Sequence, residues 1–228
     1  MSSGLIYLFL IGPALLSWYA QKRVREAFKH YETRRASSGL SGLEAARRLL
    51  AHHQLGNVAV EQTPGHLTDH YDPTSRTLRL SEGVADGRSI TSLGVVAHEV
   101  GHAAQDAEGF RLMRVRVSMG SRLAAISQWS SLVFIGGMRS GMPIFMGLGA
   151  LMLAGMLLFS LVTLPLERDA SNRALASLTE TRLVAGEEER ASVRSVLRAA
   201  AFTYAAKLGR QLATFLFFVV IVLAARGV

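Results

Sequence analysis

Two histidines and a glutamate within five residues are the part of this chain best suited to chemistry. They lie in the run His98-Glu99-Val100-Gly101-His102. Residues four apart on an α-helix share a face, so both imidazoles can bind one zinc ion while Glu99 lies beside the zinc-bound water. Zinc lowers the pKa of that water, and the carboxylate can take its proton and pass it to a leaving amine. The pattern predicts hydrolysis of peptide bonds.

The residues around this motif favour a buried helix. Leu93–Ala97 on one side and Ala103-Ala104 on the other carry no charge and no proline, as a helix packed behind a metal site requires. Either Ser89 or Ser92 can cap the start of the helix with its hydroxyl group. We therefore expect both histidines to project from one face of a regular helix.

The hydrophobic residues predict a membrane protein. Half of the chain is hydrophobic, and the apolar residues form long runs instead of a periodic pattern. Gly4–Ala20 and Met142–Leu166 contain no charged residue, and the second run is long enough to cross a hydrocarbon core of about 30 Å. Leu123–Met138 and Gln211–Ala225 are shorter, and we expect them to cross as well. The expected fold is an α-helical integral membrane protein with about four transmembrane helices.

The basic residues are distributed unevenly around these runs. Segments 22–122 and 167–210 hold 23 of the 25 lysines and arginines, and the four-span arrangement puts both segments on one side of the membrane. The positive-inside rule makes that side cytoplasmic, with the active site there and both termini outside an inner (cytoplasmic) membrane. This sidedness explains the net charge of +8, so we expect no nucleic-acid partner.

These boundaries give an expected organisation of five segments. They are transmembrane helix 1 (1–21), a cytoplasmic metallopeptidase segment with a small sheet and the HExxH helix (22–122), a transmembrane hairpin (123–166), a cytoplasmic helical segment with the third zinc ligand (167–206) and a C-terminal transmembrane helix (207–228).

The second segment has the pattern of a small α+β domain. Ser41 and Glu44 form a capping box for a short amphipathic helix, which Gly56 is expected to stop. Val58–Glu61 and Thr77–Leu80 predict strands of a two- or three-stranded sheet. Because Thr77–Leu80 closely precedes the HExxH helix, we expect it at the sheet edge, where it could pair with an extended substrate; a purely supporting strand is the alternative.

A zinc site with two histidines needs a third ligand. The chain has no cysteine, so this ligand must be a histidine or a carboxylate. Asp106 lies one turn further along the same helix face, but its short side chain reaches poorly across that turn. Glu167 is the better candidate, because it follows the Met142–Leu166 run at the predicted cytoplasmic surface, where a new helix is expected to begin. A carboxylate that only stabilises this helix start would give the same pattern.

Four stretches carry a family resemblance in their order and spacing. They are Thr68–Pro73, Leu80–Glu82, Ala97–Gly109 and Leu164–Ser171. Together they look like the YugP-type membrane zinc metallopeptidases of the neutral zinc metallopeptidase family, and more distantly like the HtpX-like gluzincins. The match covers nearly the whole chain.

The resemblance implies a gluzincin-like catalytic part that binds Zn²⁺ through His98, His102 and Glu167. Gluzincins usually have an aspartate four residues after the ligand glutamate, where it supports a histidine ligand. This chain has Ser171 there, so Asp169 or Asp106 is the candidate for that supporting role.

A peptidase of this type also needs a donor for the developing oxyanion. The resemblance favours His70, and Tyr204 is a weaker candidate. The alternatives are a surface histidine in a turn and an interfacial aromatic residue near the last span.

Together these features predict a membrane-anchored zinc endopeptidase that acts on unfolded or membrane-proximal segments at the cytoplasmic face. A catalytically silent zinc-binding scaffold is one alternative, although it would not need Glu99. An intramembrane-cleaving metalloprotease is another, but Arg88 and Asp106 flank the motif too closely for a spanning helix.

The expected partners are a protein or peptide substrate and the lipid bilayer. Gly147, Ala150 and Ala154 form a small-residue face that suits helix packing or a homo-oligomer. A protease that faces the cytoplasm is also expected to need a membrane regulator.

Overall fold

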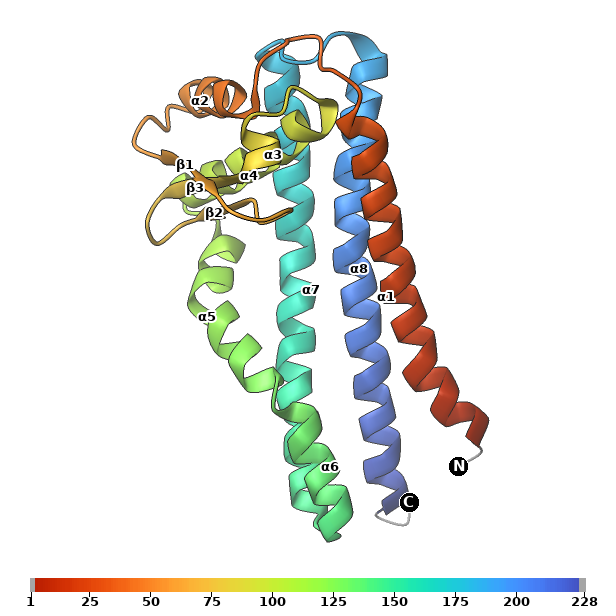
Figure 1. Ribbon diagram of the computed structural model, residues 1–228. Coiled ribbons are helices and arrows are strands. Elements are labelled where there is room, and N and C mark those ends of the chain that lie inside the picture. Colours follow the sequence, from red (N-terminus) through yellow and green to blue (C-terminus); the bar gives the residue numbers. More distant parts are fainter. Residues whose placement is uncertain (1–2, 226–228) are drawn as a thin grey trace. The chain divides into compact units, whose positions relative to one another are not determined.

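The computed structural model describes residues 3–225, and the ends of the first and last predicted segments, residues 1–2 and 226–228, lie outside this range (Figure 1). Helices dominate it. In chain order the elements are α1 (Ser3–Glu32), α2 (Gly42–His52), β1 (Ala59–Thr63), β2 (His70–Asp72), β3 (Thr77–Ser81), α3 (Glu82–Ala85), α4 (Ile90–Ala107), α5 (Arg111–Ser127), α6 (Ser130–Ser140), α7 (Pro143–Glu180) and α8 (Gly186–Ala225). The expectation of a mostly helical chain with a small sheet is confirmed.

The described residues form two compact units. One, which we call the polar unit, comprises Lys22–Arg114 and Pro165–Phe202. The other, the apolar unit, comprises the chain up to Gln21, Val115–Leu164 and the chain from Thr203 onward. The polar unit contains the HExxH motif, and the apolar unit contains most of the long uncharged runs.

The polar unit contains one three-stranded sheet with the order β1-β3-β2. β1 is parallel to β3, with Ala59 opposite Thr77, and β2 is antiparallel to β3, with Tyr71 opposite Leu78. The expectation that Thr77–Leu80 forms the sheet edge is therefore wrong, because this strand is hydrogen-bonded on both sides. The parallel partner is separated by a loop and a further strand, and such long-range pairing has no local signal in the sequence.

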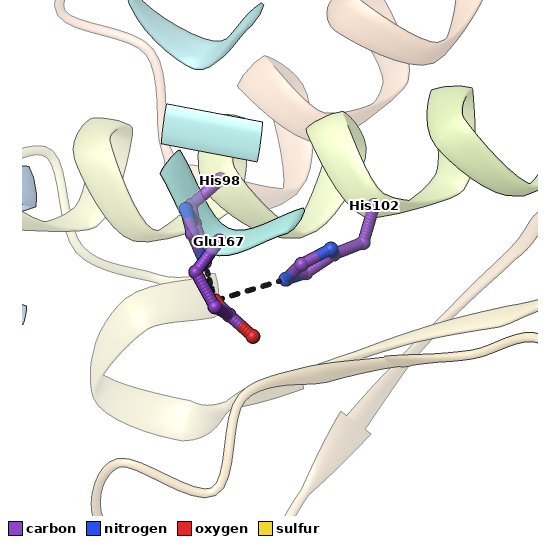
Figure 2. Close-up of side chains that lie close together, drawn as sticks. All are labelled: His98, His102 and Glu167. Carbon is purple, nitrogen blue, oxygen red and sulfur yellow. Dashed lines mark hydrogen bonds and ion pairs between the residues drawn. The ribbon is translucent and has the colours of Figure 1, made fainter. Parts of the chain in front are cut away.

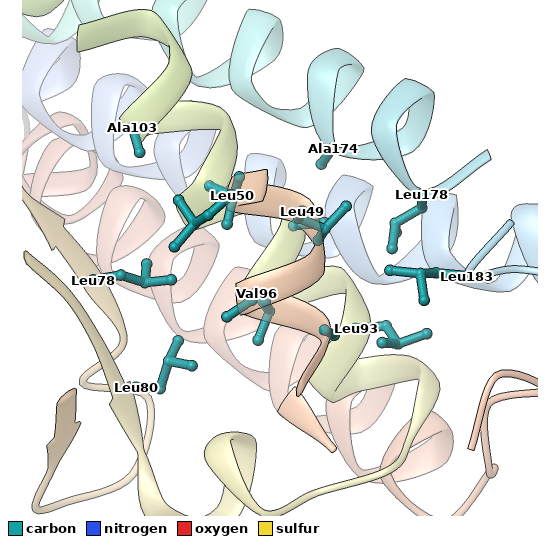
Figure 3. Packing of buried hydrophobic residues seen from close by; sticks show 14 of the residues in the cluster. Leu49, Leu50, Leu78, Leu80, Leu93, Val96, Ala103, Ala174, Leu178 and Leu183 are labelled. Atoms are coloured by element: carbon teal, nitrogen blue, oxygen red, sulfur yellow. The ribbon is translucent and has the colours of Figure 1, made fainter. Parts of the chain in front are cut away.

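The core of the polar unit joins this sheet to the helices. Leu78 and Leu80 of β3 are fully buried, as are Leu49 of α2 and Leu93 and Val96 of α4. Figure 3 shows these side chains together with Ala174 and Leu178 of α7. The HExxH helix therefore has the sheet and α2 packed against it, and this packing keeps it rigid.

Helix caps in the polar unit largely follow the local sequence. Ser41 Oγ accepts a hydrogen bond from the Glu44 backbone N–H (3.3 Å), and the Ser41 N–H donates to Glu44 Oε2 (2.7 Å), so the capping box is confirmed. α2 ends at His52, before Gly56, because Gln54 adopts the left-handed conformation with φ of 58°. Of the two serines considered for α4, Ser89 is the cap.

α7 differs most clearly from the sequence-based expectation. It runs without a break from Pro143 to Glu180 with Pro165 inside it, so no new helix begins at Glu167. Proline removes one backbone hydrogen bond and often ends a helix. Leu166 and Ala170, just after it, are fully buried, and we attribute the continuity of α7 to this packing.

Among the residues that the structure describes, two helices are long and apolar enough to cross a membrane, and these are α7 and α8. They contain the predicted spans Met142–Leu166 and Gln211–Ala225, and α1 contains Gly4–Ala20. The run Leu123–Met138 is divided between α5 and α6, which is only 11 residues long. At 1.5 Å per residue α6 spans roughly 16 Å, so this run, the second predicted span in chain order, does not form one helix that could cross a membrane.

Candidate metal centre

Gly101 allows α4 and α7 to pack closely in the polar unit. A Cβ atom at this position would lie 2.7 Å from the backbone carbonyl oxygen of Ala170, which is closer than real Cβ atoms approach. His98 and His102 flank Gly101 on α4, and Glu167 lies one turn before Ala170 on α7. The close contact therefore brings the carboxylate of Glu167 to the two imidazoles.

The three side chains meet at one point, as Figure 2 shows. Glu167 Oε2 lies 3.1 Å from His98 Nε2 and 3.4 Å from His102 Nε2. Glu167 is only 2 % exposed and His102 only 4 %, while His98 is partly exposed. A carboxylate and two imidazoles thus face one another in a largely buried position with one accessible side.

The second nitrogen of each imidazole is held by another side chain. His102 Nδ1 lies 2.9 Å from Gln105 Oε1, and His98 Nδ1 lies 3.3 Å from Ser171 Oγ. An amide oxygen can only accept a hydrogen bond, so His102 must carry its proton on Nδ1. This leaves the Nε2 lone pair of His102 directed at the point where the three side chains meet.

Gln105 is itself fixed by a polar network that runs to the surface. Its Nε2 donates to Leu166 O (2.9 Å) and to Asp169 Oδ2 (2.8 Å). Asp169 also accepts from Arg173 Nε (2.6 Å), and Arg173 Nη1 donates to Glu108 Oε1 (2.6 Å). The hydrogen bonds to Glu108 and Asp169 raise the pKa of Arg173 above its ordinary value. Asp169 thus supports His102 through Gln105, and Ser171 lies at the position where an aspartate was expected.

The donor set fits zinc. Four ligands at about 2.0–2.1 Å in a tetrahedral site lie roughly 3.4 Å from one another. The three candidate ligand atoms lie within 4.8 Å of one another, and both Nε2–Oε2 distances are close to the tetrahedral value. A buried carboxylate between two imidazoles also needs positive charge nearby, and a divalent cation supplies it. Two imidazoles and a carboxylate are typical ligands for catalytic zinc.

The glutamate of the motif is held by the sheet. The backbone N–H of Tyr71 on β2 donates to Glu99 Oε2 at 3.0 Å. The phenol of Tyr71 donates to Asp106 Oδ2 on α4 at 2.9 Å. Burial, and then the hydrogen bond to Asp106, raise the pKa of Tyr71 well above its ordinary value, so the phenol keeps its proton. Asp106 therefore positions Tyr71, and Tyr71 positions the Glu99 carboxylate.

Comparisons with known proteins agree with this geometry. The model of a family described as "Putative neutral zinc metallopeptidase" matches residues 6–223. The chain belongs to this family. The resemblance to YugP-type zinc metallopeptidases is thereby confirmed.

One curated relative is similar along nearly its whole length. The chain is 41% identical over 223 residues to a Bacillus subtilis (strain 168) protein named "Putative membrane protease YugP", which covers 97% of this chain and 99% of the relative. No solved structure matches the chain.

Within this member of the neutral zinc metallopeptidase family, the other predicted site residues lie outside the three-residue cluster. Asp106 bonds to Tyr71 instead of joining the ligands. His70 is exposed, and its Nδ1 donates to Thr68 O at 2.7 Å. Neighbouring side chains on a strand point to opposite faces, so His70 points away from the face that Tyr71 presents to α4. Tyr204 lies on α8 in the apolar unit.

Two positioning residues were not predicted from the sequence. Gln105 had a usable signal, because it is a polar residue three positions after His102 in the uncharged stretch Gly101–Gln105, and three positions bring two side chains to one helix face. The backbone N–H of Tyr71 had no signal in the sequence, because its orientation toward Glu99 depends on how the sheet packs against α4.

Proposed function

We propose that this chain is a membrane-anchored, zinc-dependent endopeptidase in which His98, His102 and Glu167 bind the metal. The observation that carries the proposal is the convergence of both histidine Nε2 atoms on Glu167 Oε2, at 3.1 and 3.4 Å, beside a glutamate held by a backbone N–H. Membership of the neutral zinc metallopeptidase family supports it independently.

Each residue has a distinct role in this proposal. Bound zinc supplies Lewis acidity, which lowers the pKa of water and polarises the carbonyl group of the scissile bond. Glu99 takes a proton from the attacking water and delivers it to the leaving amine nitrogen, so water is divided between the new carboxylate and the new amine. Tyr71 keeps the Glu99 carboxylate oriented, and Gln105 keeps His102 in the tautomer that can bind metal.

The burial of the site favours an extended substrate. Glu167 and His102 are almost completely buried, so a peptide bond must enter from the partly exposed side of His98 and Glu99. A folded surface cannot supply a bond in that geometry, whereas an unfolded or membrane-proximal segment can. We propose such segments as the substrate class.

The charge distribution supports a cytoplasmic active site. The polar unit holds the motif and most of the basic residues. The two helices that could cross a membrane, α7 and α8, each contain a long uncharged stretch. Under the positive-inside rule the polar unit then faces the cytoplasm. The motif lies on α4, outside both candidate spans, which argues against cleavage within the bilayer.

The test is cleavage of casein by purified wild type, Glu99→Gln and the control Glu26→Gln, with bound zinc measured in all three. Glu26 is an exposed glutamate on α1 that forms an ion pair with Lys22 at 3.8 Å. We expect all three proteins to retain zinc, and only Glu99→Gln to lose cleavage, by about 10²- to 10⁴-fold.

Two results would contradict the proposal. If Glu99→Gln cleaves as fast as wild type, Glu99 is not the base. If wild type holds zinc but cleaves neither casein nor a panel of unfolded membrane-protein peptides, the result favours the alternative of a catalytically silent zinc-binding scaffold.

A further inference from the structure

The apolar unit contains a hollow of about 340 Å³ between α1 and α8, lined in part by polar residues. Gly209 on α8 lets the two helices pack closely at one end of it, because a Cβ atom there would lie 3.3 Å from Leu16 Cδ2. One turn further along, the hollow is lined by polar groups of Ser17 and Gln21 from α1, and of Tyr204 from α8. The Ser17 hydroxyl is buried and has no hydrogen-bond partner among the described residues.

The charge of the hollow is entirely positive. Lys207 and Arg210 line it, and no carboxylate of the described residues does so. Neither cation has a carboxylate within ion-pair distance in the part of the chain that the structure describes. Two cations placed in one concave site without acidic partners attract an anion, and the hydroxyl and amide groups beside them can donate hydrogen bonds to its oxygens.

The position of the hollow along the two helices indicates where this anion comes from. α1 has no charged residue from Gly4 to Ala20, and α8 has none from Gln211 to Ala225. The hollow therefore lies where both helices change from charged to apolar. Trp18 and Tyr19, beside it on α1, are exposed, as aromatic residues at a membrane interface commonly are. In a bilayer this level coincides with the phosphates of the lipid headgroups.

We propose that the hollow binds the phosphate headgroup of an anionic phospholipid, with Lys207 and Arg210 supplying the charge. This rests on the proposed function only in requiring that the apolar unit lies in a membrane. A bound lipid would bridge α1 and α8 at the membrane surface, because residues from both helices line the site.

The test uses Trp18 as a local reporter. Trp18 and Trp129 are the only tryptophans, so Trp129→Phe in the full-length chain leaves Trp18, beside the hollow, as the sole tryptophan, which can be excited selectively. The protein is placed in mixed vesicles of phosphatidylglycerol and phosphatidylcholine in which either the first or the second lipid is brominated. The ratio of Trp18 quenching in the two preparations gives the preference for the anionic lipid. A cation near an anionic membrane contributes about fivefold to binding. We expect a preference on the order of tenfold, reduced to near unity by Lys207→Gln with Arg210→Gln.

The matched control is Arg182→Gln with Arg198→Gln, which removes the same charge from two exposed positions of the polar unit. It should keep the preference. An equal loss in both double variants, or no preference in wild type, would overturn the proposal. Millimolar inorganic phosphate is the second arm: if it abolishes the preference, the site binds soluble phosphate and the lipid assignment is wrong.

Zinc content and casein cleavage, measured on the same samples, separate this proposal from the enzymatic one. A Lys207→Gln, Arg210→Gln protein that keeps its zinc is folded, so a lost lipid preference then reports on the hollow. A wild type that prefers phosphatidylglycerol but cleaves nothing would contradict only the endopeptidase proposal. Trp18 quenching by neither lipid would show that α1 is not in the bilayer and would overturn the lipid site.

Discussion

Leucine side chains on the two parts of α7 differ in their solvent exposure. In the apolar unit, Leu151 and Leu158 are 68% and 62% exposed. In the polar unit, Leu166 and Leu178 on the same helix are 0% exposed. The exposed leucines belong to an uncharged stretch long enough to cross a membrane, whereas the buried ones pack against the elements that carry the candidate metal centre.

This contrast indicates that the two parts of α7 have different surroundings. Exposed apolar side chains over a long uncharged stretch are costly in water but not in lipid, so the first part of α7 is suited to a bilayer. The second part, from Pro165 onward, is surrounded by other elements of the polar unit, and its position is determined by packing against α4. Glu167 lies just inside this second part, two residues after Pro165. The helix can thus link a proposed membrane anchor directly to a candidate metal ligand.

The strongest test of this contrast uses one substitution in both places. Leu178→Ala leaves a cavity in the polar core and should lower the free energy of unfolding by about 2–5 kcal/mol. Leu158→Ala should lower it by much less, because lipid or detergent can fill the space. Thermal unfolding in detergent, followed by circular dichroism, measures both. Equal losses would mean that Leu158 is also packed in a protein core.

Gly101→Ala tests whether close packing of α4 on α7 assembles the metal centre. The added Cβ would meet the Ala170 carbonyl oxygen at 2.7 Å, so we expect about 1–3 kcal/mol of destabilisation together with weaker zinc binding. Gly94→Ala on the same helix is the control, because its nearest neighbour would be Val196 Cγ1 at an ordinary 3.5 Å. If Gly101→Ala binds zinc as tightly as wild type, close packing of α4 on α7 is not needed to assemble the metal centre.

Gln105→Leu affects the network without adding a charge. It removes the acceptor for His102 Nδ1 and the bond to Asp169, so zinc affinity should fall about 10- to 100-fold with little loss of helix content. Competition with a chelating dye measures the affinity. Gln62→Leu, on the exposed strand β1, is the matched control. An unchanged zinc affinity in Gln105→Leu would show that His102 needs no support.

His70→Ala should have the smallest effect. The exposed ring bonds to Thr68 O and points away from the α4 face, so we expect far less than the roughly 10²-fold loss in kcat that removal of an oxyanion donor causes. Casein cleavage at saturating substrate gives kcat. A loss of that size, with zinc retained, would restore His70 as the oxyanion donor.

Local patterns predicted the local parts of this molecule well. The spacing of His98 and His102, the Ser41–Glu44 capping box and the cap of α4 all depend on residues within a few positions of one another. Their geometry follows from the helix repeat alone.

The features that were missed depend on contacts between distant segments. A new helix was expected to begin at Glu167, after the Met142–Leu166 run, but buried residues around this position keep α7 continuous. The position of β3 between two strands depends on its parallel pairing with β1, which no hairpin turn encodes. The meeting of Glu167 with the histidines was expected from topology, but its cause, the contact at Gly101, could be seen only in three dimensions.

The most direct test of the metal centre is the zinc content and zinc affinity of wild type, Glu167→Gln and Glu180→Gln. Glu180 is an exposed glutamate on the same helix, paired with His52, and serves as the control. We predict about one zinc per chain in wild type and Glu180→Gln, and a large loss of affinity in Glu167→Gln with the helix content unchanged. Zinc bound as tightly by Glu167→Gln as by wild type would contradict the proposal that the glutamate on α7 completes the site.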